Sequence, residues 1–202
     1  NTGDLADGGS EAVLRAFAAD ARAAGENATI ALLGDVTADG IPADDDPARA
    51  AAEAPVRALI AALDGVQGDV IVVPGDRDWR QGEDGLKRLE DILDDAFDTD
   101  VLTPGDQAGG PRESSPAEGL RLIALDTAWW LVDAADRPDG EAEDQDIRTP
   151  GDVTRVLEQI VLDRDDDRIV VLAHHPLISR GPYGGFRGDP LTGLAARTVG
   201  FS

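Results

Sequence analysis

Short apolar runs alternate along the chain with segments in which apolar residues recur at helical spacing. The runs end at Gly, Pro or Asp and predict buried strands, which lie at 29–33, 69–73, 121–125 and 168–173. The helical segments lie at 48–63, 86–97 and 152–162, with another that Ser10 can cap. We expect Pro55 to bend or interrupt its helix, because proline has no backbone N–H to donate. Strands that alternate with helices indicate an α/β fold built on a layered sheet.

Aromatic and Gly-rich segments between these elements leave alternatives open. Trp129 and Trp130 follow a predicted strand and could line a pocket or anchor a loop. The acidic stretch with Pro and Gly that continues to about Pro150 is expected to be a surface excursion. The Gly-rich stretch 181–186 could cover a site or form a surface turn. With no internal repeat and no domain linker visible, we predict one domain over residues 1–202.

The chain is strongly acidic. Its 202 residues include 41 Asp and Glu against 18 Lys and Arg, for a net charge of -23, and Lys87 is the only lysine. Dense carboxylates stay hydrated in concentrated salt, which screens their repulsion over a Debye length of roughly 3 Å at 1 M. The composition therefore predicts a salt-adapted, halophile-like protein. A moderately acidic mesophilic protein and a calcium-binding surface are the alternatives, although no EF-hand loop is visible.

Composition also narrows the partners and the kinds of site. Nucleic acid is not expected as a partner, because binding it requires a basic surface. Without cysteine, a metal must be held by carboxylate, imidazole, amide or carbonyl groups. No stretch approaches the roughly 18 apolar residues of a membrane span. The start at Asn1 looks trimmed or processed, so the compartment stays open.

Polar residues with metal-binding or phosphate-binding chemistry follow each predicted strand. They are Gly34-Asp35, Gly75-Asp76-Arg77-Asp78, Asp126 and His174-His175. Ligands of open α/β sheets bind outside the carboxyl ends of strands, so we expect these side chains to converge. Each segment also has a plain alternative, namely a Gly-Asp turn, a solvated acidic turn, a strand-end Asp or a structural histidine pair. The two histidines are the only ones in the chain, and their adjacency at a strand end favours a site.

The order and spacing of these segments resemble the calcineurin-like metallophosphoesterases, in particular the branch related to purple acid phosphatases. The resemblance is carried by Gly75-Asp76-Arg77-Asp78-Trp79, by His174-His175-Pro176 and by the stretch 125–130. It implies a layered α/β/β/α sandwich with mixed sheets that covers most of the chain. It also implies a metal-dependent phosphatase or phosphodiesterase that acts on a phosphate ester, and it makes the cell envelope or periplasm a candidate location.

The resemblance also implies roles for single residues. Asp4 would ligate one metal ion, and Asp35 would bridge two ions. Asp76 would replace the asparagine ligand of the second ion, and His174 would be its imidazole ligand. Hard oxygen ligands with a few histidines suit Mn, Fe or Zn. A metal-bound hydroxide would then attack phosphorus while both ions stabilise the charge that develops on oxygen.

The chain departs from the family pattern at several points. Arg77 stands where the family has a histidine, and it can hold a phosphate oxygen but cannot donate a proton near neutral pH. We expect His175 to lie near the phosphate and to supply that proton. No tyrosine follows Asp35 at the family position, so an iron tyrosinate site is not expected. The family's Gly-His-x-His motif and a strand before Asp4 are absent, so we expect flanking segments outside these residues. The alternative is a catalytically degenerate binding or scaffold module.

Overall fold

The computed structural model describes residues 8–105, 109–142, 145–163 and 167–176. Helices and short strands alternate along these residues, and the strands form three small sheets. The helices and strands are α1 Gly8–Ala24, β1 Thr29–Leu32, α2 Arg49–Leu63, β2 Asp69–Val72, η1 Asp78–Gln81 (a 3₁₀ helix), α3 Gly82–Phe97, β3 Arg112–Ala117, β4 Leu120–Leu125, η2 Trp129–Leu131 (a 3₁₀ helix), β5 Gly140–Ala142, β6 Gln145–Ile147, α4 Pro150–Leu162 and β7 Arg168–Ala173. The predicted α/β class is confirmed.

The two main sheets are parallel where a helix connects their strands. Strands β1 and β2 pair in parallel, from Thr29 opposite Asp69 onward, with α2 as the crossover. Strand β4 is parallel to β7, from Leu120 opposite Arg168 onward, and α4 precedes β7. Strand β3 is antiparallel to β4 and forms the other edge of that sheet. Parallel pairing brings the carboxyl ends of each pair to the same edge, where the polar motifs follow.

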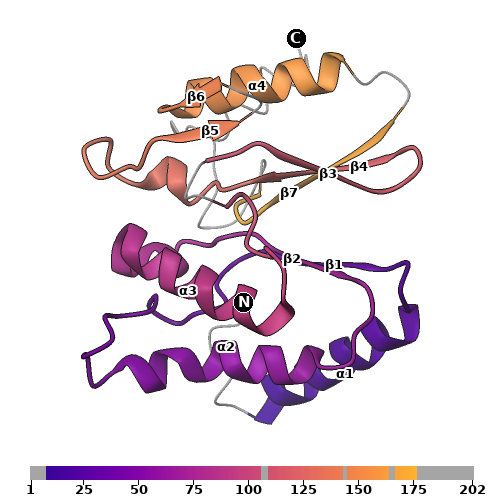
Figure 1. Ribbon diagram of the computed structural model, residues 1–202, viewed down its shortest axis with the longest axis vertical. Coiled ribbons are helices and arrows are strands. Elements are labelled where there is room, and N and C mark those ends of the chain that lie inside the picture. The colour runs from indigo at the N-terminus through magenta and orange to yellow at the C-terminus, as the bar shows by residue number, and fades with distance from the viewer. Residues whose placement is uncertain (1–7, 106–108, 143–144, 164–166, 177–202) are drawn as a thin grey trace.

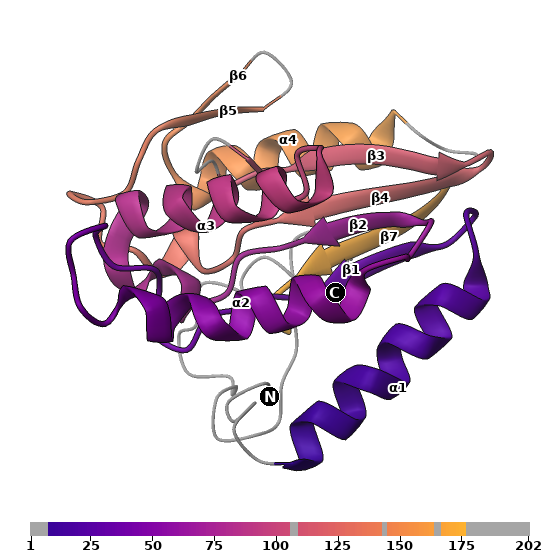
Figure 2. The same cartoon turned by 60° about the horizontal axis from the view of Figure 1, so that its bottom comes forward.

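The two sheets lie between helices. Helices α1, α2 and α3 lie beside β1 and β2 in the lower half of Figure 1, and α4 lies on the far side of β3, β4 and β7. In Figure 2, α1 and α2 again lie beside β1 and β2, and α4 again lies beside β3. Alternate side chains of the two sheets form a small apolar cluster where the sheets face each other, made of Ala31, Ile71, Val73, Leu120, Leu122, Ala124 and Leu172. The opposite faces pack on the helices, as expected from the two-residue period of a strand.

The helices differ from their predicted bounds at their first turns. Helix α3 begins at Gly82, four residues before the predicted start, and α1 begins at Gly8, so Ser10 lies inside that helix. Helix α2 runs without a break through Pro55, so of the two predicted effects, a bend or an interruption, the interruption does not occur. Helix α4 begins at Pro150 after a capping box between Thr149 and Asp152. Since the first turn uses capping and backbone groups more than an apolar face, its limits are hard to read from periodicity.

The expected surface excursion is partly folded into the core. Residues 140–147 include the antiparallel hairpin of β5 and β6, and Ile147 at its end is fully buried. Trp129 and Trp130 are also buried, and the Trp129 indole N–H donates to the carbonyl of Pro138 at 2.9 Å. Of the two interpretations of these tryptophans, the structure shows the anchor. The other described residues between 131 and 150 are exposed or half-buried, as expected of a surface segment, and Ile147 is the exception.

Candidate metal centre

Two glycines let the carboxyl ends of β1 and β2 meet closely. A Cβ atom on Gly34 would lie 2.6 Å from the Cα of Gly75 and 2.6 Å from Nδ1 of His174. A Cβ on Gly75 would lie 2.4 Å from the backbone nitrogen of Asp35. Gly34 also has a φ of 86°, which side chains rarely adopt. The two positions therefore require glycine, and their contact brings Asp35 against the loop that carries Asp76.

The buried carboxylate of Asp78 joins these two loops. Its Oδ2 accepts from the backbone nitrogens of Asp35 and Gly75, both at 2.9 Å. Its Oδ1 accepts from the backbone nitrogen and the hydroxyl of Thr37 at 2.9 and 2.8 Å. Burial raises the pKa of Asp78, and the bonds from Gly75 and Thr37 oppose that rise. Asp78 therefore acts as a clamp that fixes the backbone on which Asp35 and Asp76 are carried.

His174 lies at the end of β7 and faces both loops. Its Nδ1 is 2.7 Å from the carbonyl oxygen of Leu33. A carbonyl can only accept, so Nδ1 carries the proton and donates it. Its Nε2 lies 3.2 Å from Oδ1 of Asp76 and 3.7 Å from Oδ1 of Asp35. In the neutral ring the lone pair of Nε2 therefore faces two carboxylates, which is the arrangement in which a backbone carbonyl fixes a histidine as a metal ligand.

Without a metal ion, a protonated His174 can pair with Asp76 through Nε2. Burial raises the pKa of Asp76, the hydrogen bond and positive charge of His174 lower it together with Asp35 and His175, and the net shift is downward. Ligand atoms of Asp76, His174 and His175 lie within 4.8 Å of one another. Oxygen and imidazole donors at this spacing fit a divalent ion such as Zn²⁺ or Mn²⁺. Within the described ranges, the donors converge on one small centre rather than on two.

His175 is held by a different strand end. Its backbone N–H donates to Oγ1 of Thr127 at 3.1 Å, and its Nδ1 lies 2.9 Å from the same oxygen. Thr127 follows β4 and is fully buried. The rings of His174 and His175 pack edge to face, with centroids 4.8 Å apart. The neighbouring histidines therefore enter the centre from one strand but take their orientation from two other segments.

Arg77 faces the same carboxylate as His174. Its backbone N–H donates to Oδ1 of Asp35 at 3.1 Å, and its Nε lies 3.5 Å from Oδ2 of Asp35. The side chain is about 29% exposed, so it is open to a ligand. The guanidinium can therefore neutralise Asp35 or turn to an incoming anion.

A second buried carboxylate, that of Asp126, supports the turn after β4. Asp126 is fully buried at the end of β4, and it accepts from the indole N–H of Trp79 at 2.8 Å and from the backbone of Trp129 at 2.9 Å. Burial raises the pKa of Asp126 to about 7, against the lowering effect of these bonds. Trp79 directly follows Asp78 in η1, so its indole connects Asp126 to the loop that carries Asp76. Asp126 itself is not one of the grouped side chains Asp76, His174 and His175.

The structure brings together most of the residues that the sequence suggested. Asp35, Asp76, Arg77, His174 and His175 lie around one point. Asp4 and the stretch 181–186 lie outside the described residues. The sequence did not predict a role for Asp78 or Thr127. The one indication available was that each lies in the turn after a strand, β2 for Asp78 and β4 for Thr127. Both act through backbone amides, and a local pattern of residue types does not reveal such contacts.

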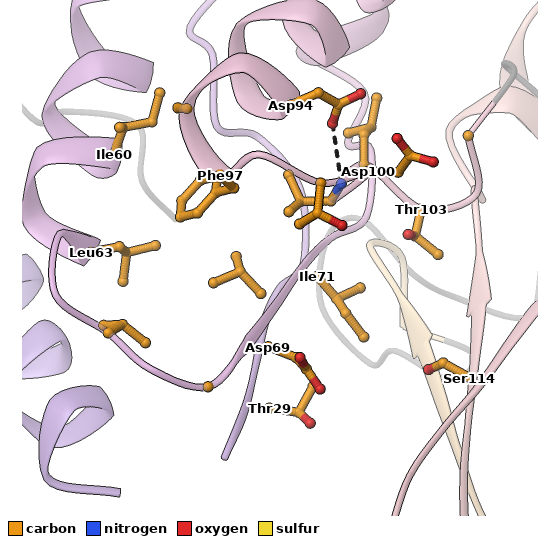
Figure 3. Close-up of a pocket in the computed structure, with 18 of the residues that line it drawn as sticks. Thr29, Ile60, Leu63, Asp69, Ile71, Asp94, Phe97, Asp100, Thr103 and Ser114 are labelled. Carbon is orange, nitrogen blue, oxygen red and sulfur yellow. Dashed lines mark hydrogen bonds between the residues drawn. The ribbon is translucent and has the colours of Figure 1, made fainter. Parts of the chain in front are cut away.

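A cleft at the opposite end of β1 and β2 is separate from this centre. It has a volume of ≈ 1180 Å³ and opens between α2, the end of α3 and strand β3. Figure 3 shows Thr29 and Asp69 at the strand starts, Phe97 beside the cleft, and Asp94 bonded to a backbone nitrogen. That nitrogen belongs to Val101, at 3.2 Å. The cleft is lined by many carboxylates and by neither histidine, so its size does not make it the site of chemistry.

The chain matches no protein-family model, and no curated protein or solved structure is significantly similar to it. The family likeness therefore rests on the strand-end motifs alone. Among the helices in the described part of the chain, none combines the length and the apolar character needed to cross a bilayer.

Proposed function

We propose that this chain is a metal-dependent phosphoesterase, either a phosphatase or a phosphodiesterase. The observation that carries the proposal is the setting of His174, whose Nδ1 donates to Leu33 and whose Nε2 faces Asp35 and Asp76. A buried loop contact between two glycines and a four-bond clamp are used to create this setting. A close contact between two glycines and a buried carboxylate with four hydrogen bonds are expected at a functional site and not in a solvated turn.

The groups around the cluster suit a phosphate ester. Arg77 presents a permanent positive charge next to Asp35 and can bind a phosphoryl oxygen. His175 brings a second ring with an N–H to the same place. Bound divalent ions supply Lewis acidity and lower the pKa of bound water, which neither side chain can do alone. Arg77 and His175 would orient the phosphoryl group against that chemistry.

The proposal includes two metal ions and the metallophosphoesterase type of sandwich. Two facing sheets with helices outside them support that architecture (Figure 1). In this proposal Asp35, Asp76 and His174 would ligate one ion, as the distances from Nε2 of His174 to both carboxylates allow, and a second ion would share Asp35. Its further ligand would be Asp4, which lies outside the described residues. The salt-adapted character stays a prediction and sets the conditions for every experiment below.

A second function, that of a binding module without catalysis, is favoured by one contact. The Nε atom of Arg77 lies 3.5 Å from Oδ2 of Asp35, the carboxylate that would bridge the ions. An arginine in that position can balance the charge of the carboxylate without any metal. In that case the close contact between the two loops would serve to bind an anion through Arg77.

The deciding experiment measures metal binding and hydrolysis on the same preparation. The protein is folded in molar salt, titrated calorimetrically with Mn²⁺ or Zn²⁺, and assayed with a nitrophenyl phosphate monoester and diester. We expect stoichiometric binding and metal-dependent hydrolysis, both lost in Asp35→Asn and both kept in Asp20→Asn, since Asp20 is an exposed residue of α1. Binding without hydrolysis of either ester would support the binding module. No stoichiometric binding would end the proposal.

A further inference from the structure

The two adjacent histidines contact chemically different partners. Nδ1 of His174 meets a carbonyl oxygen, that of Leu33. Nδ1 of His175 meets a hydroxyl, that of Thr127. A carbonyl only accepts a hydrogen bond, whereas a hydroxyl has one proton to donate as well as lone pairs to accept. The two rings are therefore under different constraints, although they are neighbours in sequence and in space.

The bonds of Thr127 decide how its proton is used. Its Oγ1 already accepts the backbone N–H of His175 at 3.1 Å. Thr127 is fully buried, and across the described segments its hydroxyl has hydrogen bonds with His175 alone. A buried O–H with no acceptor costs free energy, because its bond to water has been given up. Donation to Nδ1 of His175 satisfies the hydroxyl, and the opposite direction would leave its proton without a partner.

We infer that Thr127 is a positioning residue that holds neutral His175 in the tautomer with its proton on Nε2. His174 is held by Leu33 in the other tautomer, with its proton on Nδ1 and its Nε2 lone pair toward Asp35 and Asp76. One histidine is thus prepared to ligate a metal ion through Nε2, and its neighbour is prepared to donate a hydrogen bond through Nε2. Of the three grouped side chains, Asp76 and His174 would then ligate the ion, and His175 would donate a hydrogen bond.

The role of the donor rests on the proposed function. A phosphoryl oxygen that binds beside Arg77 would accept a hydrogen bond from Nε2–H of His175. A neutral imidazole is far too weak an acid to give up that proton, so the contact stabilises charge and transfers no proton. This role replaces our expectation that His175 supplies a proton to the leaving group. The ion would depend on Asp35, Asp76 and His174, without His175.

Nuclear magnetic resonance can test the tautomers directly, because the chain has only two histidines. The full chain is labelled with ¹⁵N, folded in molar salt, and studied by long-range ¹H–¹⁵N spectra over a pH series up to the plateau where both rings are neutral. We expect one ring protonated on Nδ1 and the other on Nε2. Addition of Zn²⁺ should shift Nε2 of the first ring strongly and leave Nε2–H of the second in place.

Two substitutions assign the effect to the hydroxyl. In Thr127→Val, which keeps the shape but lacks the O–H, the pattern of His175 should move toward a mixture of tautomers while that of His174 stays fixed. In Thr127→Ser, which keeps the O–H, the Nε2–H pattern should return. Should the valine variant fail to fold, the wild-type spectra still decide the question.

The outcomes separate this inference from the proposed function. A wild-type His175 protonated on Nδ1, or one that loses Nε2–H to Zn²⁺, would overturn the inference even if the protein hydrolyses esters. Opposite tautomers with no response of either ring to Zn²⁺ would leave the inference standing and count against the metal centre.

Discussion

The centre has two halves that are held in different ways. The first half is the pair of loops after β1 and β2, which carry Asp35 and Asp76, and the second half is the strand ends of β4 and β7. In the first half, Asp78 gathers backbone N–H groups from both loops, so the peptide itself is fixed and the carboxylates of Asp35 and Asp76 follow. In the second half, Asp126 accepts from the indole of Trp79 and from the backbone of Trp129 and Ala128, and the histidines are oriented one by one. Each half thus contains one fully buried aspartate that does not join the cluster.

Carboxylate and imidazole side chains at the centre are positioned by different means. Two loops that bring their carboxylates together need a rigid backbone, because the like charges would otherwise push the loops apart. A histidine needs its ring nitrogen to be specified, which a single carbonyl or hydroxyl accomplishes. The first half should therefore be more sensitive to loss of its buried aspartate than the second.

The largest expected effect compares the two buried aspartates. Asp78→Ala removes the acceptor of four hydrogen bonds and should lower the free energy of unfolding by at least about 3 kcal/mol, since each buried donor left unpaired is costly. Asp126→Ala leaves fewer donors unpaired and should lower it by about 1–3 kcal/mol. Urea unfolding in molar salt measures both, with Asp20→Ala as the exposed control. Equal losses in the two variants would contradict the difference between the halves.

A smaller effect is expected from the contact between the two glycines. Gly34→Ala should lower the free energy of unfolding by about 1–3 kcal/mol more than Gly25→Ala. Both glycines have positive φ, but a Cβ at Gly25 meets nothing within 4 Å, whereas one at Gly34 meets Gly75 and His174. Thermal unfolding of the two variants in the same salt isolates the close approach from the strain of positive φ. Matching midpoints would show that the loops have room to separate.

A pH dependence of stability is expected from Asp126, at the end of β4. The pKa of Asp126 is raised from 3.8 to about 7, so the folded state binds more protons than the unfolded state between these values. Its contribution to stability is full below the unfolded value and is lost as pH rises through the folded value. Between about pH 5 and about pH 8, the free energy of unfolding should fall more steeply in wild type than in Asp126→Asn. Parallel pH profiles would place the titration elsewhere.

Much of the fold could be predicted because its strands are apolar runs, even where an edge strand such as β7 leaves Val170 and Val171 exposed. The runs that became β1, β2, β4 and β7 are nearly all apolar, which a sequence reveals without knowledge of the partners. Strand β3 was missed because its polar residues give no alternating pattern and it lies at a sheet edge. The hairpin of β5 and β6 was missed for a similar reason, since Ile147 is its one fully buried residue in the described part.

The candidate site was predicted at the level of residues and missed at the level of contacts. His174 stands out because it directly follows an apolar run, and Asp35 and Asp76 stand out because each follows a glycine at the end of such a run. Asp78 did not stand out, because another aspartate in so acidic a chain carries little information. The role of Thr127 depends on the pairing of β4 with β7, which aligns its strand end with His175. Such pairing is a tertiary fact that spacing along the chain does not contain.

The most direct test of the account is a double-mutant cycle on metal affinity. Zn²⁺ is titrated calorimetrically in molar salt into wild type, His174→Ala, Asp76→Ala and the double variant. Because both side chains are held to ligate the same ion, each single substitution should weaken binding by about 100-fold or more. The double variant should bind little more weakly than either single one. Losses that multiply across the cycle, or affinity unchanged by either substitution, would show that His174 and Asp76 do not form one metal centre.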